Sequence, residues 1–456
     1  MSRSRGHRAG APARGLVEKL QQRIARRTAK VGIVGLGYVG LPLACLFAEK
    51  GFPVTGFDVD PKKIGSLNAG RSYIKHIAGK RVGALVRAGR LTGSGEFRDL
   101  RKMDAVIICV PTPLTRFREP DMRFVVATAE TVASMLRRGQ LVVLESSTYP
   151  GTTTELVKPI LERGGLKSGR DFLLAYSPER EDPGNETYGT ASIPKVIGGD
   201  GPAALDIAKK LYDGAVVKTV PVSSPETAEA IKLTENIFRA VNIAMVNELK
   251  VIFDAMGIDV WEVIEAAKTK PFGYMPFYPG PGLGGHCIPI DPFYLTWKAR
   301  AHNINTRFIE LAGEINTQMP RYVVTRLTEA LSRRSGKALR GSKILMLGLA
   351  YKKNIDDMRE SPALTLIEML EELGAVVSYH DPYIARIKPS REHGALTDRR
   401  SVPLTPARIA AADAVLIVTD HDRIDYRDVA RHAKLVVDTR NALARAGVAG
   451  GKIVKA

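Results

Sequence analysis

The sequence predicts an α/β fold in which two doubly wound domains with parallel sheets are joined by a long central helix and a helical dimerisation region. Two stretches, starting at Ala29 and at Lys343, each show an apolar run, a glycine turn, a helical pattern and a second apolar run ending in aspartate. A helical pattern over residues 225–257 lies between them. Such a helix would be about 45–50 Å long, enough to connect two domains. This order is typical of two Rossmann-like domains with a helical region between them.

The domain boundaries follow from where these patterns start and stop. We expect a basic N-terminal leader over residues 1–28, a first α/β domain over 29–222, a central helical domain with a cysteine loop over 223–330, and a C-terminal α/β domain over 331–456. A chain of 456 residues is long enough for two to four domains at roughly 100–200 residues each.

Composition narrows the classes of function. The net charge is +19, but residues 1–30 hold nine Lys or Arg and a single Glu, so nearly half of the excess lies in the first 30 residues, mostly in the leader. No motif that reads nucleic acid accompanies the charge, and no run of about 18 uncharged apolar residues predicts a membrane span. We therefore expect neither nucleic acid nor membrane as a partner. The start lacks the apolar region of a secretion signal, and three cysteines are too few for a disulfide framework, so we expect a cytoplasmic location.

A glycine turn, GLGYVG over residues 35–40, lies between the first apolar run and a helical pattern. Gly35 permits the tight turn, Gly37 lets a pyrophosphate approach the backbone, and Gly40 allows helix and strand to pack closely. The helix N-terminus then offers unpaired N–H groups and a positive dipole end to the phosphates. The pattern predicts a dinucleotide-binding site.

An acidic residue, Asp58, ends the strand after this helix, about 20 positions beyond the glycines. Its carboxylate accepts hydrogen bonds from the adenosine ribose and repels a 2′-phosphate, so we expect NAD rather than NADP. Lys63 is close enough in sequence to weaken that preference.

Further apolar runs predict buried parallel strands at residues 104–113, 140–151, 172–180 and 195–199. In sheets of this kind, ligands lie at the carboxyl ends of the strands. Thr112, Thr148 and Glu179 fall at these ends, which makes them candidate ligand-contacting residues.

The central helix starts with a proline and ends at a glycine. Lys232 and Asn236 stand one turn apart on one face, and the apolar surroundings favour a buried lysine that polarises an oxygen. A solvated helix face is the alternative. More helix is expected over residues 260–267 and 305–333, and the surplus apolar residues of the central helix predict a homodimer or a higher homo-oligomer.

The second α/β domain repeats the first with altered chemistry. Its turn reads GLAYKK from Gly348, without the second and third glycines. Ser361 is the expected cap of a helix over residues 362–373, and Asp381 ends the next strand. The lost glycines and added lysines indicate an anion other than a dinucleotide. Two more strands are expected at residues 413–420 and 434–441.

One cysteine, Cys287, lies in the loop GPGLGGHCIPIDP over residues 280–292. Cys45 and Cys109 fall inside a helix and a strand, where a cysteine is usually a small buried hydrophobe. Cys287 lies in neither, and we expect it to be a nucleophile rather than a buried filler. With no second histidine at metal spacing, we expect no metal.

The glycines of this loop, Gly282, Gly284 and Gly285, bare the backbone near Cys287, and exposed amides stabilise a thiolate and a developing oxyanion. Asp291 supplies a carboxylate that positions a water or a proton. Beside a nicotinamide, a cysteine suggests that an alcohol is oxidised to a carbonyl, which the sulfur attacks. A second oxidation of the thiohemiacetal gives a thioester that water cleaves, so a primary alcohol becomes a carboxylate with two NAD.

Six motifs then match a known family in order: VGLGYVGLPLA, ESSTYPGTT, SPEREDPGN, AEAIKLTEN, GPGLGGHCIPIDP and GLAYKKNIDDMRESPAL. From Ala29 to the C-terminus the chain resembles the UDP-glucose/GDP-mannose dehydrogenase family of nucleotide-sugar 6-dehydrogenases. The resemblance implies an NAD-binding N-terminal domain, a dimer contact on the central helix, and a C-terminal domain that binds UDP.

The resemblance also implies residue roles. Cys287 would be the thioester-forming nucleophile, Lys232 and Asn236 would stabilise the reacting oxygens, and Asp291 would assist with water and protons. Glu179 and Thr148 match positions that hold the catalytic water or contact the substrate. We expect the cofactor to contact Gly35, Gly37, Tyr38, Val39, Gly40, Asp58, Lys63, Thr112, Thr148 and Arg359. We expect the substrate to contact Glu179, Arg180, Lys232, Asn236, Tyr278, Gly282, Gly285, His286, Lys352 and Arg440.

The subgroup is indicated by departures from the UDP-glucose pattern: Arg180 follows Glu179, His286 precedes Cys287, and Ile290 precedes Asp291. These features are similar to the UDP-N-acetylglucosamine 6-dehydrogenases, so UDP-N-acetylglucosamine is the first choice of substrate. UDP-glucose, UDP-N-acetylgalactosamine and UDP-N-acetylmannosamine are alternatives. A single-step alcohol dehydrogenase with an inert Cys287, and a protein that binds NAD or a nucleotide sugar without turnover, are more remote ones.

Overall fold

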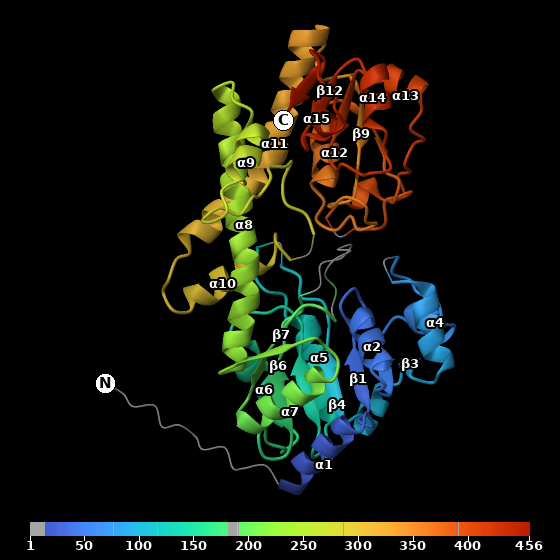
Figure 1. Cartoon of the computed structure of the whole chain (residues 1–456), viewed down its shortest axis with the longest axis vertical. Coiled ribbons are helices and arrows are strands. Elements are labelled where there is room, and N and C mark those ends of the chain that lie inside the picture. The colour runs from blue at the N-terminus through green and yellow to red at the C-terminus, as the bar shows by residue number, and fades with distance from the viewer. Residues whose placement is uncertain are drawn as a thin grey trace. The chain divides into compact units, whose positions relative to one another are not determined.

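The computed structural model describes residues 14–75, 77–115, 117–180, 189, 191–285, 287–390 and 392–456. The chain forms two compact units, which we describe separately. Unit 1 comprises Met1–Glu235 and Phe293–Asn303, and unit 2 comprises Asn236–Pro292 and Ile304–Ala456. Each unit contains its own sheet, and the long helices α8 (Pro225–Ala255) and α11 (Arg307–Ser335) are present (Figure 1). The predicted α/β class with two sheets and long connecting helices is confirmed.

The described residues of unit 1 form an eight-stranded sheet in the order β3-β2-β1-β4-β5-β6-β7-β8. The strands are β1 (Val31–Val34), β2 (Val54–Phe57), β3 (Leu91–Ser94), β4 (Ala105–Ile108), β5 (Leu141–Leu144), β6 (Leu173–Tyr176), β7 (Lys195–Gly199) and β8 (Thr219–Val222). The helices are α1 (Arg14–Ala25), α2 (Gly40–Glu49), α3 (Pro61–Asn68), α4 (Gly79–Arg87), η1 (Phe97–Lys102), α5 (Arg123–Met135), η2 (Thr152–Val157), α6 (Lys158–Glu162) and α7 (Pro202–Asp213).

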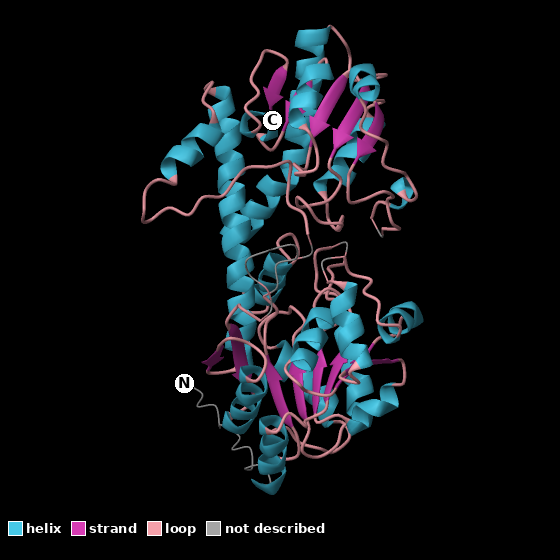
Figure 2. Ribbon diagram, turned by 45° about the vertical axis from the view of Figure 1, so that its right-hand side comes forward, coloured by secondary structure: helices cyan, strands magenta, loops and turns pink. Residues whose placement is uncertain are grey.

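Successive residues of the central strands face two separate cores. Ile33 and Ile107 pack with α2 and α7, whereas Val34 and Ile108 pack with α5 and α6. The sheet is therefore buried on both faces, which explains the near-continuous apolar strands. Figure 2 shows the strands in magenta between cyan helices.

One strand runs differently from the prediction. β7 was expected to be parallel with its neighbours, but Ala175 and Tyr176 of β6 pair antiparallel with Gly199 and Gly198 of β7. A parallel partner would need a crossover connection, usually a helix, whereas an antiparallel strand needs none. The described part of the connection, residues 177–180, 189 and 191–194, contains no helix. The reversal brings the start of β7 to the carboxyl edge of β6.

The helix α1 lies within the range expected as a leader. Its Leu20 and Ile24 are buried in the core that contains α2 and α7. Arg23 Nη1 lies 2.7 Å from Asp104 Oδ1, just before β4. Residues 1–13 lie outside the described residues. The α1 helix is therefore part of the packed core of unit 1.

The described residues of unit 2 form a five-stranded parallel sheet in the order β10-β9-β11-β12-β13. The strands are β9 (Lys343–Leu347), β10 (Val376–His380), β11 (Ala414–Ile417), β12 (Val436–Asp438) and β13 (Ile453–Lys455). Helices α11 and α12 cover one face, and α13, α14 and α15 cover the other. The remaining elements are α9 (Val260–Ala267), α12 (Pro362–Glu372), η3 (Gly394–Leu396), α13 (Pro406–Ala411), α14 (Tyr426–His432) and α15 (Ala442–Arg445), and α10 (Asp291–Arg300) begins in this unit.

The helix predictions hold closely. Ser361 caps α12 by accepting a hydrogen bond from the Ala363 N–H, as predicted. Cys45 and Cys109 are buried, also as predicted.

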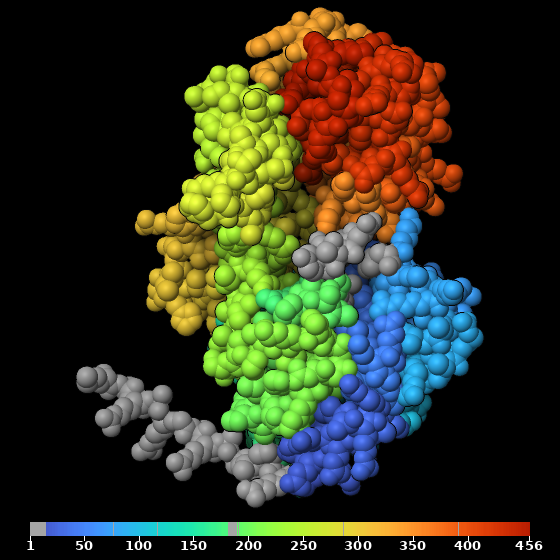
Figure 3. All heavy atoms as spheres, in the orientation of Figure 1, coloured from blue at the N-terminus to red at the C-terminus, as the bar shows by residue number. Residues whose placement is uncertain are grey.

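In unit 2, α8 and the segment after it expose several large apolar side chains, and this part of the surface is yellow-green in Figure 3. No helix among the described residues has the length and apolarity that a membrane crossing requires.

Candidate functional site

The glycine turn after β1 leaves no room for a side chain at Gly35 or Gly40, but it leaves open space at Gly37. Gly35 has a φ of +93°, and a Cβ there would lie 2.5 Å from the Cys109 carbonyl oxygen. A Cβ at Gly40 would lie 1.8 Å from the Gly35 carbonyl oxygen, whereas a Cβ at Gly37 would meet nothing within 4 Å. Two glycines therefore keep the turn and α2 together, and Gly37 leaves the backbone accessible at the helix N-terminus. These are the properties that a pyrophosphate site requires.

Asp58, directly after β2, is buried beside this turn. It accepts hydrogen bonds from the Leu36 N–H, the Asp60 N–H and Lys63 Nζ, each at 2.9 Å. Burial alone raises the pKa of Asp58, but these hydrogen bonds outweigh it and hold that pKa below its ordinary value. The carboxylate is ionised at neutral pH and suits a ribose diol. The turn and this acid fit NAD, whose 2′-hydroxyl is uncharged.

The two predicted threonines lie near the carboxyl ends of β4 and β5. Thr112 is buried, and its carbonyl accepts a 2.7 Å hydrogen bond from the hydroxyl of Tyr294 on α10. Thr148 is completely buried, and its hydroxyl has no hydrogen-bond partner among the described residues. A buried hydroxyl without a partner is costly unless a ligand or water completes it. Thr148 is therefore a good candidate for ligand contact.

The loop that carries Thr148 is fastened to α8 by a buried carboxylate, Glu229, which the sequence did not single out. Glu229 accepts hydrogen bonds from the Gly151 N–H at 2.6 Å, the Thr153 N–H at 2.9 Å and the Thr153 hydroxyl at 2.7 Å. Burial raises the pKa of Glu229 to about 7, although these hydrogen bonds oppose the shift. Glu229 lies one turn before Lys232, so it holds that part of α8 against the loop.

Glu179, after β6, belongs to a buried charge network that the sequence analysis missed. Lys195 Nζ lies 2.8 Å from Glu145 Oε2, 3.7 Å from Glu179 Oε2 and 3.3 Å from the Pro178 carbonyl oxygen. The other Glu145 oxygen accepts a hydrogen bond from the Tyr212 hydroxyl. Glu145 and Lys195 are charged residues at the ends of apolar strands, which is the signal that could have identified them.

Lys232 is buried, as predicted, and its Nζ donates a 2.5 Å hydrogen bond to the Glu179 carbonyl oxygen. Arg180 makes an ion pair with Glu235 and donates to the Pro194 carbonyl oxygen at 2.8 Å. Unit 1 thus brings Glu179, Arg180 and Lys232 together around one backbone segment.

Unit 2 brings together the loop cysteine, Asp291 and Asn236. The Cys287 carbonyl accepts hydrogen bonds from the Ile290 N–H at 3.2 Å and the Asp291 N–H at 2.8 Å, so Cys287 sits on a tight turn that leads into α10. Its side chain is partly exposed, whereas Asp291 and Asn236 are completely buried. The Asn236 amide donates to Asp291 Oδ2. His286 lies outside the described residues.

The glycines of this loop pack closely against other parts of unit 2, and the backbone amide of Gly285 is engaged, against our expectation of a bared amide there. A Cβ at Gly284 would lie 2.5 Å from Tyr351 Cβ, and a Cβ at Gly285 would lie 2.8 Å from the Tyr351 ring. Gly285 also has a φ of +83°, and its N–H donates a 3.0 Å hydrogen bond to the Arg359 carbonyl oxygen. The amide of Gly285 is thus not available to an oxyanion. Gly284 and Gly285 instead let the loop pack against the side chain of Tyr351, and Gly282, with a φ of +133°, lies beside Pro362.

The other predicted substrate residues of unit 2 lie around this loop and on nearby elements. Arg440 donates from Nε to the Val418 carbonyl oxygen at 2.9 Å, and burial lowers the pKa of its guanidinium. A Cβ at Gly280 would lie 2.5 Å from Arg440 Nη1, so this arginine packs against the start of the cysteine loop. Lys352 lies on the turn after β9, and Tyr278 donates from its hydroxyl to Glu265 at 2.8 Å.

Three predicted cofactor residues remain. Arg359 pairs through its guanidinium with Asp357 at 2.6 Å. Tyr38 and Val39 lie in the turn directly before α2.

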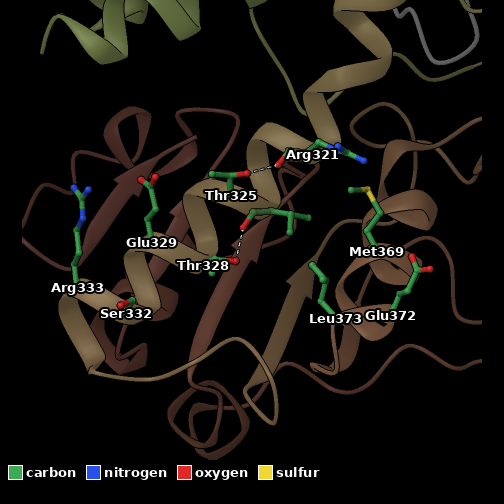
Figure 4. Close-up of a pocket in the computed structure, with 10 residues that line it drawn as sticks. Arg321, Thr325, Thr328, Glu329, Ser332, Arg333, Met369, Glu372 and Leu373 are labelled. Atoms are coloured by element: carbon green, nitrogen blue, oxygen red, sulfur yellow. Dashed lines mark hydrogen bonds between the residues drawn. The ribbon is translucent and has the colours of Figure 1, made fainter.

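A groove of about 610 Å³ between α11 and α12 contains none of these residues. Figure 4 shows that the hydroxyls of Thr325 and Thr328 bond back to their own helix, to the carbonyl oxygens of Arg321 at 3.0 Å and Val324 at 2.8 Å. These two hydroxyls are therefore engaged, and charged side chains of both signs, Arg321, Arg333, Glu329 and Glu372, also line the groove.

Comparisons with known proteins agree with this geometry. Residues 29–216 match the NAD binding domain of the UDP-glucose/GDP-mannose dehydrogenase family, residues 226–318 match its central domain, and residues 345–445 match its UDP binding domain.

Two curated relatives are similar over most of the chain. A UDP-N-acetyl-D-glucosamine 6-dehydrogenase of Pseudomonas aeruginosa is 36% identical over 86% of this chain and 90% of its own length. A UDP-N-acetyl-D-mannosamine dehydrogenase of Pyrococcus horikoshii is 34% identical over 91% of this chain and 96% of its own length. The solved structure of a UDP-D-ManNAc dehydrogenase from P. horikoshii superimposes with a TM-score of 0.83 at 33% identity, covering 93% of this chain and 98% of that one.

Proposed function

We propose that this chain, which belongs to the UDP-glucose/GDP-mannose dehydrogenase family and is an NAD-dependent oxidoreductase of UDP-sugars, oxidises UDP-N-acetylglucosamine at C6 to the uronic acid. The observation that carries the four-electron chemistry is a partly exposed cysteine, Cys287, on a tight turn that leads directly into a buried carboxylate, Asp291. The preference for a 2-acetamido sugar rests on sequence features beside these residues.

NAD, when bound, supplies a nicotinamide carbon that accepts hydride. We assign its binding to the turn Gly35–Gly40 and to Asp58, because the open backbone at Gly37 and the ionised carboxylate suit a pyrophosphate and a ribose. Thr112, Thr148 and Arg359 are further proposed contacts.

In the first oxidation, Lys232 and Asn236 hold the C6 oxygen and stabilise the negative charge that develops on it as the proton leaves. The hydride departs from C6 and an aldehyde forms. The Cys287 sulfur then attacks the aldehyde carbon, giving a thiohemiacetal, and loss of a second hydride converts it to a thioester. Each oxidation removes one hydride and one proton, two electrons in all, from the substrate or its cysteine adduct.

Water completes the reaction by attacking the thioester carbon, which releases the carboxylate and restores the Cys287 thiol. Asp291, held by the Asn236 amide, accepts or relays the proton of that water. Thr148 suits a water or substrate contact, because its buried hydroxyl lacks a partner among the described residues. Glu179 is assigned to the same water or to the sugar.

The choice of sugar is supported by Arg180, which takes the place of the phenylalanine typical of UDP-glucose dehydrogenases. Ile290 likewise replaces a lysine before Asp291. Both curated relatives described above are named for 2-acetamido UDP-sugars. UDP-N-acetylmannosamine and UDP-N-acetylgalactosamine remain rival substrates. Lys352, Arg440 and Tyr278 are proposed to contact the nucleotide sugar from unit 2.

The deciding experiment is a steady-state comparison of UDP-N-acetylglucosamine, UDP-N-acetylmannosamine, UDP-N-acetylgalactosamine and UDP-glucose with the full chain. We expect the highest kcat/KM with UDP-N-acetylglucosamine and two NADH for each sugar oxidised. A higher kcat/KM with another sugar would refute the substrate assignment. Cys287→Ser should stop at the aldehyde level with no carboxylate formed, whereas Cys109→Ala, at a buried cysteine outside the proposed chemistry, should keep the stoichiometry of two.

We also propose that the chain forms a homodimer through the exposed apolar side chains of α8 and the following segment. Met245, Ile252, Met256 and Phe272 are 44%, 45%, 64% and 71% exposed. Large exposed apolar patches mark interaction sites in soluble proteins. Analytical ultracentrifugation should show a dimer that Ile252→Glu weakens, and an unchanged mass distribution would contradict this surface.

A further inference from the structure

The ammonium group of Lys195 is enclosed in the interior of unit 1, although lysine is almost never fully buried without a partner. Only 4% of the Lys195 side chain is exposed, and the Glu145 side chain is completely buried. Their 2.8 Å ion pair and the hydrogen bond from Tyr212 satisfy Glu145. The proposed mechanism uses neither Lys195 nor Glu145.

Lys195 is placed to act on its neighbours as well as to pair with Glu145. Its Nζ lies 3.3 Å from the Pro178 carbonyl oxygen and 3.7 Å from Glu179 Oε2. Lys232 Nζ donates to the next carbonyl oxygen along the chain, that of Glu179, at 2.5 Å. Two ammonium groups, one from β7 and one from α8, therefore hold two consecutive carbonyls of the same segment.

The strand order explains how Lys195 reaches this position. Because β7 runs antiparallel to β6, its first residue lies near the segment that leaves β6. Ser177 strengthens that join by donating from its hydroxyl to the Val196 carbonyl oxygen at 2.8 Å. The backbone of Lys195 is thus fixed in place, and its side chain extends from there to Glu145 and Glu179.

The charge on Lys195 persists in spite of its burial. Burial lowers the pKa of Lys195, but Glu145 and Glu179 outweigh it and raise that pKa above its ordinary value. On the Glu145 side the network ends at Tyr212, which is completely buried and packs against Phe47 with ring centroids 5.6 Å apart. The charge of Lys195 is thus held in one place, which suits positioning of Glu179.

We propose that Lys195 is a positioning residue that fixes the Glu179 carboxylate and, through the 178–179 segment, the ammonium group of Lys232. The proposal rests on the roles given above to Glu179 and Lys232. Small displacements of such groups have large effects on rate, because catalytic geometry tolerates little misplacement. Loss of Lys195 should therefore lower kcat while the dinucleotide turn Gly35–Gly40 stays intact.

The test uses the full chain with six variants and three readouts, namely the Tm, kcat with the preferred UDP-sugar, and KM for NAD. Lys195→Met leaves Glu145 buried without its cation, so it should lower the Tm as well as kcat. Lys195→Met combined with Glu145→Gln removes both charges and should recover most of the Tm. We expect kcat at least tenfold below wild type in both variants, with KM for NAD within twofold.

Lys195→Arg keeps the cation and should return kcat to within threefold of wild type. Lys158→Met is the matched control, because Lys158 pairs with Asp200 at 2.8 Å in the same unit but touches neither Glu179 nor Lys232. This variant should leave kcat unchanged.

A double variant that regains wild-type kcat together with its Tm would overturn the proposal, because Lys195 would then serve stability alone. Near-normal kcat in Lys195→Met would overturn it too. These outcomes are distinct from a failure of the proposed function, in which wild-type protein would reduce no NAD with any nucleotide sugar. If Glu179→Gln and Lys232→Met both kept the wild-type kcat, Glu179 and Lys232 would lose their assigned roles. Lys195 would then have no catalytic group to position.

Discussion

The turn after β1 in unit 1 and the turn after β9 in unit 2 have the same beginning. Gly35 and Gly348 have φ values of +93° and +86°, and a Cβ at either would lie within 2.5 Å of a carbonyl oxygen, at 2.5 Å from Cys109 and 2.3 Å from Thr419. They then diverge. In unit 1 the helix starts at Gly40, whereas in unit 2 the position five residues after Gly348 is the exposed Lys353, and the next helix starts only at Pro362.

The aspartates that follow the two turns, Asp58 and Asp381, also differ in their hydrogen-bond partners. Asp58 accepts hydrogen bonds from two backbone N–H groups and from Lys63, whose side chain is one-third exposed. Asp381 accepts from four backbone N–H groups and from Nε2 of the buried His421. Asp58 thus keeps one partner at the surface, whereas Asp381 is enclosed by its own unit. We propose that the acid serves ligand binding in unit 1, whereas in unit 2 it serves local structure.

The largest effect should come from Gly40→Ala, because its Cβ would lie 1.8 Å from the Gly35 carbonyl oxygen and force α2 away from the turn. We expect NADH affinity, measured by fluorescence titration, to fall by at least about 100-fold, or about 2.7 kcal/mol. Lys353→Ala, at the corresponding position of unit 2, should leave that affinity unchanged. Equal NADH affinities in both variants would show that the two turns are not functionally distinct.

Gly348→Ala should act on stability instead. The new Cβ would combine a positive φ with a 2.3 Å approach to the Thr419 carbonyl oxygen, so we expect a loss of about 2–3 kcal/mol in the free energy of unfolding of unit 2, with unchanged NADH affinity. Gly341→Ala is the control: φ is +77° but nothing lies within 4 Å, so only the backbone strain of about 1 kcal/mol remains. Equal losses in the two variants, from urea unfolding, would exclude the steric contact as a cause.

Lowering the pH should reveal how much Asp381 contributes to the free energy of unfolding. Although burial raises it, the hydrogen bond and charge of His421 and the backbone N–H groups of Ala350 and Tyr383 bring the pKa of Asp381 from 3.8 to about 2. A lowered pKa contributes stability that is present above pH 3.8 and lost as the pH falls toward 2, here about 2 kcal/mol. Asp381→Asn should remove this part of the pH dependence in urea unfolding between pH 5 and pH 2.5. A variant with the slope of wild type would assign the acid sensitivity to other groups.

The smallest effect concerns cofactor choice. Asp58→Ser removes the charge that repels a 2′-phosphate and leaves Lys63 without its partner, so the ratio of kcat/KM for NADP to that for NAD should rise about tenfold, or about 1.4 kcal/mol. Lys63→Ala should change the ratio by less than about threefold. If both ratios stay at the wild-type value, Asp58 does not select the cofactor.

Local sequence signals predicted the elements whose ends are set locally. The helix α9 occupies residues 260–267 as predicted, and its cap is Asp259, which accepts from the Trp261 N–H at 3.1 Å. The edge strands β3, β8 and β13 were not predicted, because four residues or fewer with partial burial carry little pattern and depend on the neighbouring strand.

The site residues likewise divide into those that local motifs could identify and those that only the folded structure brings together. Motifs could place Cys287, Lys232 and Asp58 on a loop, a helix and a strand end. They could not reveal that Lys195 pairs with Glu145, since fifty residues separate the two and only the sheet order joins them. The packing of Gly285 against Tyr351 was hidden for the same reason.

The division between the two units falls inside a helix, between Glu235 and Asn236 of α8, and so between Lys232 and Asn236. This has a consequence for recombination among relatives that differ in sugar preference. A crossover within α8 would separate two residues that one helical turn keeps in register. Functional chimaeras should therefore inherit the helix whole, with junctions before Pro225 or after Ala255.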